Sequence, residues 1–446
     1  MKQYDLIVLG TGGAGYQVAT KCKQAGWNVA VINNGLAGGT CAVRGCIPKK
    51  ILAGTAEIMD INRRLSEIGI VKEQPEMSWL ELIKFKRTFT DPVPPSTKQG
   101  LEDAGIDYYQ GMPRFIGNLQ LEVSGEQLMA KKIHIAVGAK PAKLPIEGFE
   151  HLVTSDDFLE LNELPKKIIF VGGGYVSFEF AHVAVRFGVD VTILHNDDHP
   201  LPIFDQDIIQ QLLAASKEVG IKVELNTKVQ KVEKTGSGVT VLAADGRAFE
   251  GGLAVHGAGR LPAISELNLE ATGVEYDKRH GVLVDEYLRS ISNPDVFAAG
   301  DAAMSGPPLS PVADAQGGIV ADNLLGKAHK QPGYLSTPSV IFVTPPVAKV
   351  GYLESEAETK GIEFETVTND LVDWFDSARL NLKHAKSKVL IEKGTGKIIG
   401  AHLIGNHAED LINIFSLAIE LGLTTEQLKA PIFAFPTASD DMRSMF

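Results

Sequence analysis

The chain has 446 residues, of which 44% are hydrophobic and 22% charged, enough apolar material for about two to four packed domains. Its net charge of −12 argues against nucleic acid or an anionic membrane as a partner. No apolar run reaches the length of about 18 residues that predicts a membrane span. Because an apolar strand follows Met1 almost at once, no signal peptide is expected and the protein is predicted to be cytoplasmic.

The secondary-structure pattern repeats once along the chain. Residues 4–32 and 167–194 each read as apolar strand, glycine-rich turn, helix and second strand, an order that predicts parallel sheets covered on both faces. Between them, residues 50–110 predict helices and then a loop at the prolines of residues 91–95, followed by short strands at 119–123 and 132–137. From about residue 334, five strands and an amphipathic helix at 409–422 predict a separate α+β domain.

Both glycine turns fit dinucleotide-binding fingerprints. The first contains Gly10, Gly12, Gly13 and Gly15, and glycines there allow the backbone and a helix N-terminus to approach a pyrophosphate. Such sites expect an acidic ribose ligand near residue 33; Asn33 is neutral, but its amide can still bond a hydroxyl. The second turn contains Gly172 and Gly174 and has Ser177 in place of the third glycine.

The chain has 3 cysteines, and two of them stand close together. Cys41 and Cys46 follow Gly39 and Thr40 at the start of an expected helix, where a thiol pKa is lowered. In a protein expected in the cytoplasm, such a pair indicates catalysis or metal binding more than a structural disulfide. No further His or Cys lies just outside the pair, so no zinc site is predicted. Cys22 is interpreted as a core residue.

These motifs resemble those of the class I pyridine nucleotide–disulfide oxidoreductases, the family of glutathione reductase, dihydrolipoamide dehydrogenase and mercuric reductase. The strongest likeness is Gly38-Gly39-Thr40-Cys41-Ala42-Val43-Arg44-Gly45-Cys46-Ile47-Pro48-Lys49-Lys50. Further matches surround Gly138, Gly259 and Asp301, and the resemblance covers nearly the whole chain. It implies an α/β fold with two Rossmann-like domains, for FAD and NAD(P), and a C-terminal α+β dimerisation domain. The expected boundaries are 1–145 and 263–332 for FAD, 146–262 for NAD(P), and 333–446 for dimerisation.

The resemblance also implies roles for single residues. Cys41 would be the interchange thiol that attacks the substrate, and Cys46 the thiolate against the flavin. Lys50 and Glu179 match the family's ion pair near the flavin, and Asp301 would hold the ribityl chain. The expected cofactor-binding residues are Gly10, Gly12, Gly13, Gly15, Asn33, Gly39, Thr40, Lys50, Gly138, Gly172, Gly174, Tyr175, His195, Gly259, Arg260, Gly300 and Asp301.

The C-terminal signature departs from the family. The family's His-Pro-Thr-x-x-Glu reads here Phe435-Pro436-Thr437-Ala438-Ser439-Asp440. Phe435 replaces the His that protonates the leaving thiolate from the partner subunit, a loss that costs about 10²–10⁴-fold for a general acid. Asp440 is interpreted as a structural carboxylate. The chain also lacks the C-terminal cysteine pair of mercuric reductases.

The leading hypothesis is a homodimeric, FAD-dependent NAD(P)H oxidoreductase that acts in cell redox homeostasis. Electrons would pass through the Cys41–Cys46 disulfide to a disulfide or related sulfur compound. His195 could meet a phosphate, which favours NADPH over NADH. The alternatives are reduction of quinones, metal ions or oxygen, a C–S cleavage like that of 2-ketopropyl-coenzyme M oxidoreductase/carboxylase, which also has Phe there, and a non-enzymatic flavoprotein. Lys84, Arg87 and Arg379 are candidates for binding an anionic substrate.

Overall fold

The computed structural model describes residues 1–446 and contains two compact units. Unit 1 is formed by Met1–Pro48, Lys84–Ala142 and Gly259–Tyr334, and unit 2 by Lys49–Ile83, Lys143–Ala258 and Leu335–Phe446. Each unit therefore gathers three stretches that are distant in the sequence, and the chain passes between the units five times.

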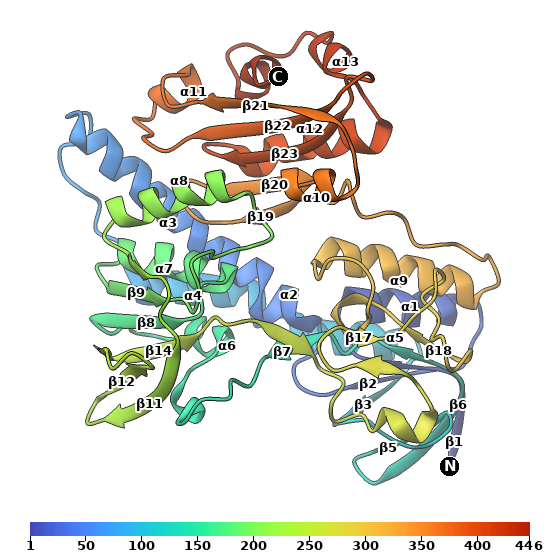
Figure 1. Ribbon diagram of the computed structural model, residues 1–446. Coiled ribbons are helices and arrows are strands. Elements are labelled where there is room, and N and C mark those ends of the chain that lie inside the picture. Colours follow the sequence, from blue (N-terminus) through green and yellow to red (C-terminus); the bar gives the residue numbers. More distant parts are fainter. The chain divides into compact units, whose positions relative to one another are not determined.

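Unit 1 is built on a seven-stranded sheet of the order β3-β2-β1-β6-β5-β4, with β18 also paired to β6 (Figure 1). The strands β1, β2, β3, β6 and β18 run parallel, whereas β4, β5 and β6 form an antiparallel meander. Their bounds are β1 (Lys2–Leu9), β2 (Val29–Asn33), β3 (Asp107–Gln110), β4 (Arg114–Gly117), β5 (Gln120–Val123), β6 (Glu126–Ile135) and β18 (Val296–Ala298). Two strand pairs lie outside this sheet, β7 (Ala139–Pro141) with β15 (Arg260–Pro262) and β16 (Tyr276–Asp277) with β17 (Gly281–Val282).

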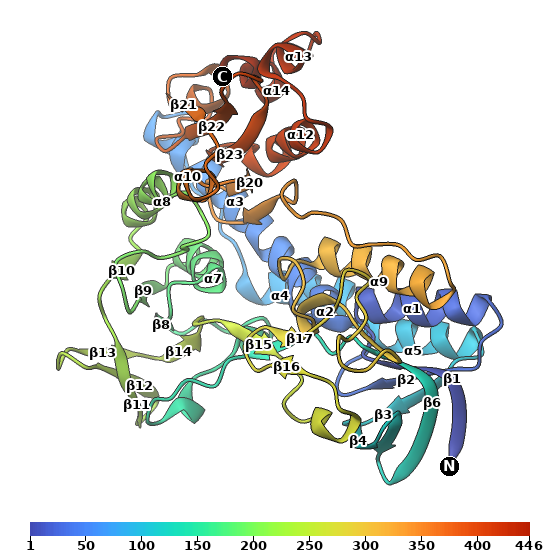
Figure 2. The same cartoon turned by 45° about the vertical axis from the view of Figure 1, so that its right-hand side comes forward.

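The helices of unit 1 are α1 (Gly13–Gln24), α2 (Gly39–Arg44), α5 (Val93–Asp103), α9 (Ser310–Leu324) and the 3₁₀ turns η2 (Leu269–Thr272) and η3 (Gly300–Ala302). Two of these helices, α1 and α2, carry the first glycine motif and Cys41 near their starts. Helices α1 and α9 lie side by side in both views (Figures 1 and 2). The small residues Ala14 and Gly317 permit this approach, because a Cβ on Gly317 would lie 2.7 Å from the Ala14 Cα.

The break predicted at residues 91–95 is confirmed at Asp91 and Pro92, which form a turn, but the loop predicted beyond it is wrong. Pro92 is the N-cap of α5 and Pro94 lies in its first turn, so the helix begins here. The first-turn N–H groups of a helix have no intrahelical partner, and proline therefore costs nothing there and fixes a helical φ. The prolines mark the boundary between two helices, α4 (Trp79–Thr90) and α5.

Unit 2 contains a parallel sheet of the order β10-β9-β8-β14. Aromatic side chains of α6, α7 and β8, among them Phe158, Phe170, Phe178 and Phe180, pack in its core together with Leu52 of α3. The elements are α3 (Cys46–Glu67), α6 (Ser155–Phe158), α7 (Tyr175–Arg186), α8 (Gln206–Glu218), η1 (Phe149–His151), β8 (Lys167–Val171), β9 (Asp190–Leu194), β10 (Lys222–Glu224), β14 (Leu253–His256) and an antiparallel sheet of β11 (Val229–Thr235), β12 (Gly238–Ala243) and β13 (Ala248–Gly251).

The C-terminal part of unit 2 is a five-stranded antiparallel sheet of the order β19-β20-β23-β22-β21, against which α12 packs. The elements are β19 (Ser339–Ile341), β20 (Val347–Gly351), β21 (Phe364–Asp370), β22 (Lys386–Glu392), β23 (Ile398–Ile404), α10 (Glu354–Thr359), α11 (Phe375–Ala378), α12 (Ala408–Leu421), α13 (Thr425–Lys429), α14 (Ala438–Asp441) and η4 (Met442–Ser444). The predicted fold class is confirmed: both strand–turn–helix–strand segments form parallel sheets, and an α+β segment follows.

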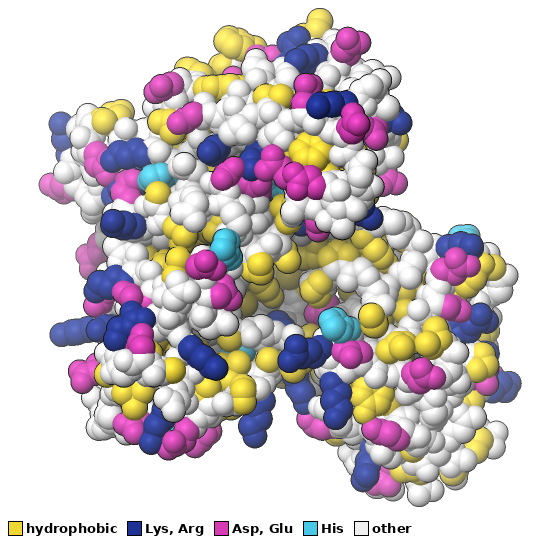
Figure 3. Space-filling view, in the orientation of Figure 1, with side chains coloured by type: hydrophobic (Ala, Val, Ile, Leu, Met, Phe, Trp, Pro, Cys, Tyr) yellow, Lys and Arg dark blue, Asp and Glu magenta, His cyan; other side chains and the backbone are white.

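Two surface properties bear on partners. No helix of the structure is both long and apolar enough to cross a membrane. On the face shown in Figure 3, acidic and basic side chains are interspersed, and no large field of one charge covers that face.

Candidate active site

The first glycine turn needs its glycines for steric reasons. Gly10 has a φ of +108°, and a Cβ on it would lie 2.3 Å from the Ala136 carbonyl oxygen. A Cβ on Gly15 would lie 2.3 Å from the carbonyl oxygen of Gly10. Gly12 is the N-cap of α1 and supplies no side chain to the first-turn N–H groups, which leaves them for an anionic ligand. The turn therefore fits the pyrophosphate of a dinucleotide.

Thr11 joins this turn to the cysteine loop, a role that the sequence did not reveal. Its hydroxyl donates to Asn33 Oδ1 at 2.9 Å and accepts from the Gly38 N–H at 3.0 Å. The Asn33 amide nitrogen donates to the Gly35 carbonyl at 3.0 Å. Asn33 also hydrogen-bonds Tyr108, and it is thus buried and oriented at the end of β2, with one lone pair of its Oδ1 left for a ribose hydroxyl.

The two cysteines lie at the starts of successive helices. Cys41 is the third residue of α2 and Cys46 the first of α3, and both are free thiols in this structure. Gly39 has a φ of +77°, and a Cβ on it would lie 2.5 Å from the Gly12 Cα, so the cysteine loop packs directly against the first glycine turn. Ser310, the first residue of α9, places its Oγ 3.2 Å from the Cys46 Sγ.

The expectation that the helix start lowers the pKa of Cys41 is not met. The hydrogen bond with Cys46 raises the pKa of Cys41, and burial raises it further; the Ser310 hydroxyl opposes both, with a smaller effect. A helix of six residues also has only a weak terminal charge to oppose them. These effects favour the protonated form of the Cys41 thiol.

Residues of η3 and α9 complete this part of unit 1. The Gly300 N–H donates to the Gln316 Oε1 at 2.7 Å, and Gln316 is fully buried. Burial raises the pKa of Asp301, while the charge of Arg260 lowers it. Asp314 lies over the first glycine turn, because a Cβ on Gly13 would fall 1.6 Å from its Oδ1. Gln316 and Asp314 were missed by sequence reasoning: Gln316 bonds Gly300 outside any recognised motif, and Asp314 contacts the turn at Gly13, about 300 residues away in the sequence.

The second glycine turn, in unit 2, is built like the first. Gly172 has a φ of +103°, and a Cβ on it would lie 2.5 Å from the Ala258 Cα. Gly174 is the N-cap of α7 and has no capping side chain. Ser177, in the place of the third glycine, donates its hydroxyl to the Gly172 carbonyl at 2.5 Å. The serine thus adds a bond within the turn and leaves the first-turn N–H groups available.

His195 lies at the end of β9 with both ring nitrogens engaged. Its Nδ1 accepts from the Gly173 N–H at 3.1 Å, and its Nε2 lies 2.8 Å from Asp197 Oδ1, so the ring proton resides on Nε2. The hydrogen bonds from the N–H of His199 and from the His195 ring hold the pKa of Asp197 below its ordinary value. An ionised, half-exposed carboxylate therefore stands beside this glycine turn.

The expected Lys50–Glu179 ion pair is replaced by a different one. Lys49 Nζ, one residue earlier, lies 2.7 Å from the buried Glu179 Oε1, which also accepts from the Phe342 N–H at 2.8 Å. Lys50 Nζ lies 3.9 Å from Glu409 instead, and both ammonium groups lie 4.3 Å from the centre of the Phe342 ring. Of the two adjacent lysines of α3, Lys49 is the one whose side chain reaches the Glu179 carboxylate. The family motif alone does not show which of the two lysines does so.

The remaining predicted residues occupy turns, helix starts or exposed positions. Thr40 and Tyr175 are exposed at the first turns of α2 and α7, and Arg260 donates to the Ala139 carbonyl at 2.5 Å. Gly138 and Gly259 adopt positive φ angles of 66° and 102°. Of the side chains predicted to bind an anionic substrate, Lys84 and Arg87 are carried by α4, and Arg379 forms an ion pair of 2.7 Å with Asp376.

At the C-terminus, Phe435 is 83% exposed. Asp440 lies in α14, where it faces Arg443 at 3.4 Å.

Two glycine turns with open helix starts and a thiol pair beside the first of them define a flavin- and nicotinamide-dependent redox protein. The chain belongs to the pyridine nucleotide-disulphide oxidoreductases: residues 4–317 match the model of that family, and residues 337–446 match its dimerisation domain. The family uses FAD and a pyridine nucleotide, and its members are oxidoreductases, as predicted.

Several well-described proteins are similar over nearly the whole chain. A mercuric reductase of Staphylococcus aureus is 31% identical over 99% of this chain and 81% of its own length. A dihydrolipoyl dehydrogenase of Bacillus subtilis (strain 168) is 29% identical over 98% of this chain and 94% of its own. Among solved structures, the Cu(II) complex of the HOCl-induced flavoprotein disulfide reductase RclA from Escherichia coli matches with a TM-score of 0.90 and 27% identity, over 100% of this chain and 99% of that one.

Proposed function

We propose that this protein oxidises NAD(P)H with bound FAD and passes the electrons through Cys41 and Cys46 to an oxidised metal ion. The observation that supports the route is the thiol pair, which packs against the first glycine turn through Gly39 and contacts Ser310. When bound, FAD supplies the hydride-accepting chemistry that no side chain has. The residues that would hold it are the glycines of the first turn, Asn33 and Asp301.

Two features favour a metal ion over a disulfide as the acceptor. A disulfide leaves as thiolates that need a proton, and Phe435 cannot donate one. A metal ion needs no such proton, and thiolates are the ligands that soft ions such as Cu⁺ and Hg²⁺ prefer. Relatives named mercuric reductase and the Cu(II) complex of RclA agree with this class of acceptor. With copper, two Cu²⁺ ions and two thiols give two Cu⁺ ions, one disulfide and two protons.

An acceptor comparison tests this proposal. Anaerobic NAD(P)H oxidation by the FAD-loaded protein is measured with Cu²⁺, with Hg²⁺ and with glutathione disulfide. We expect at least one metal ion to be reduced faster than the disulfide by about tenfold or more, because the disulfide reaction lacks its general acid. Equal or faster turnover of the disulfide would contradict the metal-ion proposal.

Reduction of a disulfide or related sulfur compound is the second candidate, and the likeness to a dihydrolipoyl dehydrogenase favours it. The variant Phe435→His separates the two candidates. If the missing acid limits disulfide turnover, this variant should increase it by roughly tenfold or more and leave metal-ion turnover unchanged. Phe435→Leu, which removes the aromatic ring without adding a proton donor, is the matched control and should change neither reaction.

The preference between the nicotinamides rests on the His195–Asp197 pair. The NADPH preference predicted above needs His195 to face a phosphate, but accepting the Gly173 N–H uses the nitrogen that would have to be protonated. The Asp197 carboxylate can accept bonds from ribose hydroxyls and repels a 2′-phosphate. We therefore propose NADH as the preferred donor.

Replacing Asp197 tests this preference. In Asp197→Ala, the ratio of kcat/KM for NADH to that for NADPH should fall by roughly tenfold, the size of one lost hydrogen bond to a charged group. Asp190→Ala is the matched control, because it removes a carboxylate from the opposite end of the same strand, where it pairs with Lys222. Wild-type protein that prefers NADPH would contradict the proposal, and so would an unchanged ratio in Asp197→Ala.

The family's dimerisation domain supports a homodimer. Leu417, Leu421, Ile432 and Phe435 are exposed large hydrophobic side chains of this part of the chain, and Ile432 is 97% exposed. Such side chains are those that a second copy would cover. We further propose the domain boundaries given above, a small-molecule substrate and a cytoplasmic location, where thiol pairs are kept reduced.

A further inference from the structure

The Ser310 hydroxyl contacts the redox pair. Its Oγ lies 3.2 Å from the Cys46 Sγ, and it also influences Cys41, whose pKa it lowers against the stronger opposing effects of Cys46 and burial. Ser310 is 264 residues away from Cys46 in the sequence, so no local motif predicts this contact.

The start of α9 fixes the position of Ser310. Leu309 is the N-cap and has no polar side chain, and Pro311 follows Ser310 within the first turn. Ser310 therefore supplies the hydroxyl at this helix start, and the fixed φ of Pro311 restricts the backbone next to it. The charged side chains within four residues of Cys41, Cys46 or Ser310 in the sequence are Arg44 of α2, Lys49 and Lys50 of α3 and Asp314 of α9.

We propose that Ser310 positions the single proton of the reduced pair, by donating its hydroxyl to Cys46 and thereby making Cys46 the thiolate and Cys41 the thiol. The inference rests on the proposed dithiol route. A thiolate can only accept hydrogen bonds, so Ser310 must be the donor once Cys46 is ionised. Cys41 then donates its S–H to the same sulfur, and Cys46 receives two hydrogen bonds while Cys41 keeps its proton.

The balance of the reduction step shows why this choice matters. Cleavage of the Cys41–Cys46 bond takes two electrons, which the NAD(P)H oxidation supplies, and one proton, and gives one thiolate and one thiol. Without Ser310, a thiolate on Cys46 would lose one of its two hydrogen bonds. Phe435 stands where the family has a histidine and cannot act as a base. The neutral hydroxyl of Ser310 can favour the thiolate on Cys46 without such a base.

The test is a pH titration of the long-wavelength charge-transfer absorbance that a Cys46 thiolate gives beside bound flavin. The FAD-loaded protein is reduced anaerobically with dithiothreitol, so that the readout depends on neither nicotinamide nor acceptor. In Ser310→Ala, the midpoint pH should rise by about one unit, roughly a tenfold loss of thiolate below the midpoint, as expected for one hydrogen bond to a charged sulfur. Ser310→Thr keeps the hydroxyl and should restore the wild-type midpoint.

Ser96→Ala, at an exposed serine of α5 in the same unit, is the control for an unrelated serine, and FAD content reports correct folding of every variant. A Ser310→Ala midpoint equal to that of wild type would overturn the inference, and so would Ser310→Thr behaving like Ser310→Ala. A wild-type protein that binds FAD and shows no band at any pH would overturn both this inference and the dithiol route. A normal band with no shift would overturn only the role of Ser310.

Discussion

Replacing Cys41 by alanine is expected to reduce acceptor turnover by at least about 10³-fold, the scale of removing one member of a catalytic group that acts as a unit. Cys46 alone cannot form the intramolecular disulfide that accepts and releases two electrons. NADH should still reduce the flavin of this variant, because its second glycine turn lies in unit 2 and is unchanged. The measurement is anaerobic NADH oxidation with Cu²⁺ and with glutathione disulfide.

Cys22→Ala is the matched control for this prediction. Cys22 is fully buried on α1, and burial raises its pKa to about 12, so it is an inert thiol at neutral pH. Its replacement should leave turnover within about twofold of wild type, since it removes only one small buried group. Turnover by Cys41→Ala at the wild-type rate would show that electrons leave the flavin directly, and a quinone, oxygen or outer-sphere metal reductase would replace the dithiol proposal.

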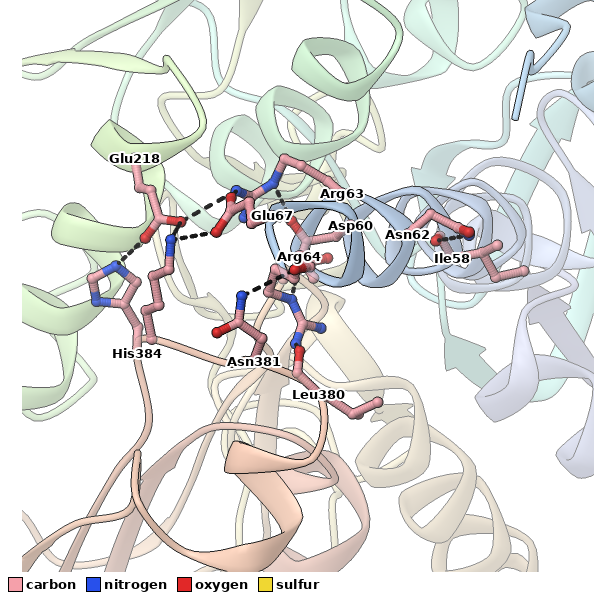
Figure 4. A network of polar contacts seen from close by, with 12 residues as sticks. Ile58, Asp60, Asn62, Arg63, Arg64, Glu67, Glu218, Leu380, Asn381 and His384 are labelled. Carbon is pink, nitrogen blue, oxygen red and sulfur yellow. Dashed lines mark hydrogen bonds and ion pairs between the residues drawn. The ribbon is translucent and has the colours of Figure 1, made fainter. Parts of the chain in front are cut away.

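The second large effect is expected on stability. Asp60→Ala should lower the free energy of unfolding by about 3–5 kcal/mol, the range for breaking a buried ion pair. Asp60 of α3 is only 3% exposed. Its Oδ2 accepts from Arg64 Nε at 2.8 Å (Figure 4). Its Oδ1 accepts from Arg186 Nη2 at 2.9 Å. The variant would leave two buried guanidinium groups without their carboxylate.

The charge state of Asp60 supports this size of effect at neutral pH. Burial alone would raise the pKa of Asp60, but Arg186, Arg64 and Arg63 together hold it below the ordinary value. Because the pKa is lower in the folded state, the stabilisation is complete above the unfolded pKa of about 4 and is lost as the pH falls through the folded value.

The effect of Asp60→Ala is measured by thermal unfolding of the FAD-loaded wild type and variant at pH 7. The midpoint should fall by several degrees, roughly 5 °C or more. Glu67→Ala is the matched control, because Glu67 belongs to the same network but is one-third exposed, and its pair with Arg63 at 2.6 Å is expected to contribute at most about 1 kcal/mol. Equal shifts in the two variants would contradict a buried, stabilising role for Asp60.

The local parts of the fold were predictable from the sequence. The segments around Gly10 and Gly172 carry strand, turn and helix signals within about 30 residues, and the structure places β1–α1–β2 and β8–α7–β9 there. The helix α5 was missed because prolines start it, and a proline pattern reads equally as a loop. The assignment of segments to the two units could not be predicted from the sequence either. Helix α3, for example, carries Cys46 in unit 1 and Leu52 in unit 2.

The sequence predicted those site residues whose type is fixed by a local motif. Cys41 and Cys46 stand in one motif, and the glycines of the two turns are required by their backbone. Ser310 and Thr11 act through contacts with distant segments, and nothing in their neighbourhood marks them. The ion pair of Glu179 with Lys49 depends on the direction of a side chain on α3, which a motif of two adjacent lysines does not fix.

The central claim is that electrons pass through the thiol pair, and one measurement tests it most directly. Purified FAD-loaded protein is reduced anaerobically with NADH, and its visible spectrum is compared with that of Cys46→Ser. The account predicts a long-wavelength charge-transfer band in the wild type that is absent from the variant. Bleaching of the flavin without such a band in the wild type would contradict it and would place the acceptor reaction at the flavin itself.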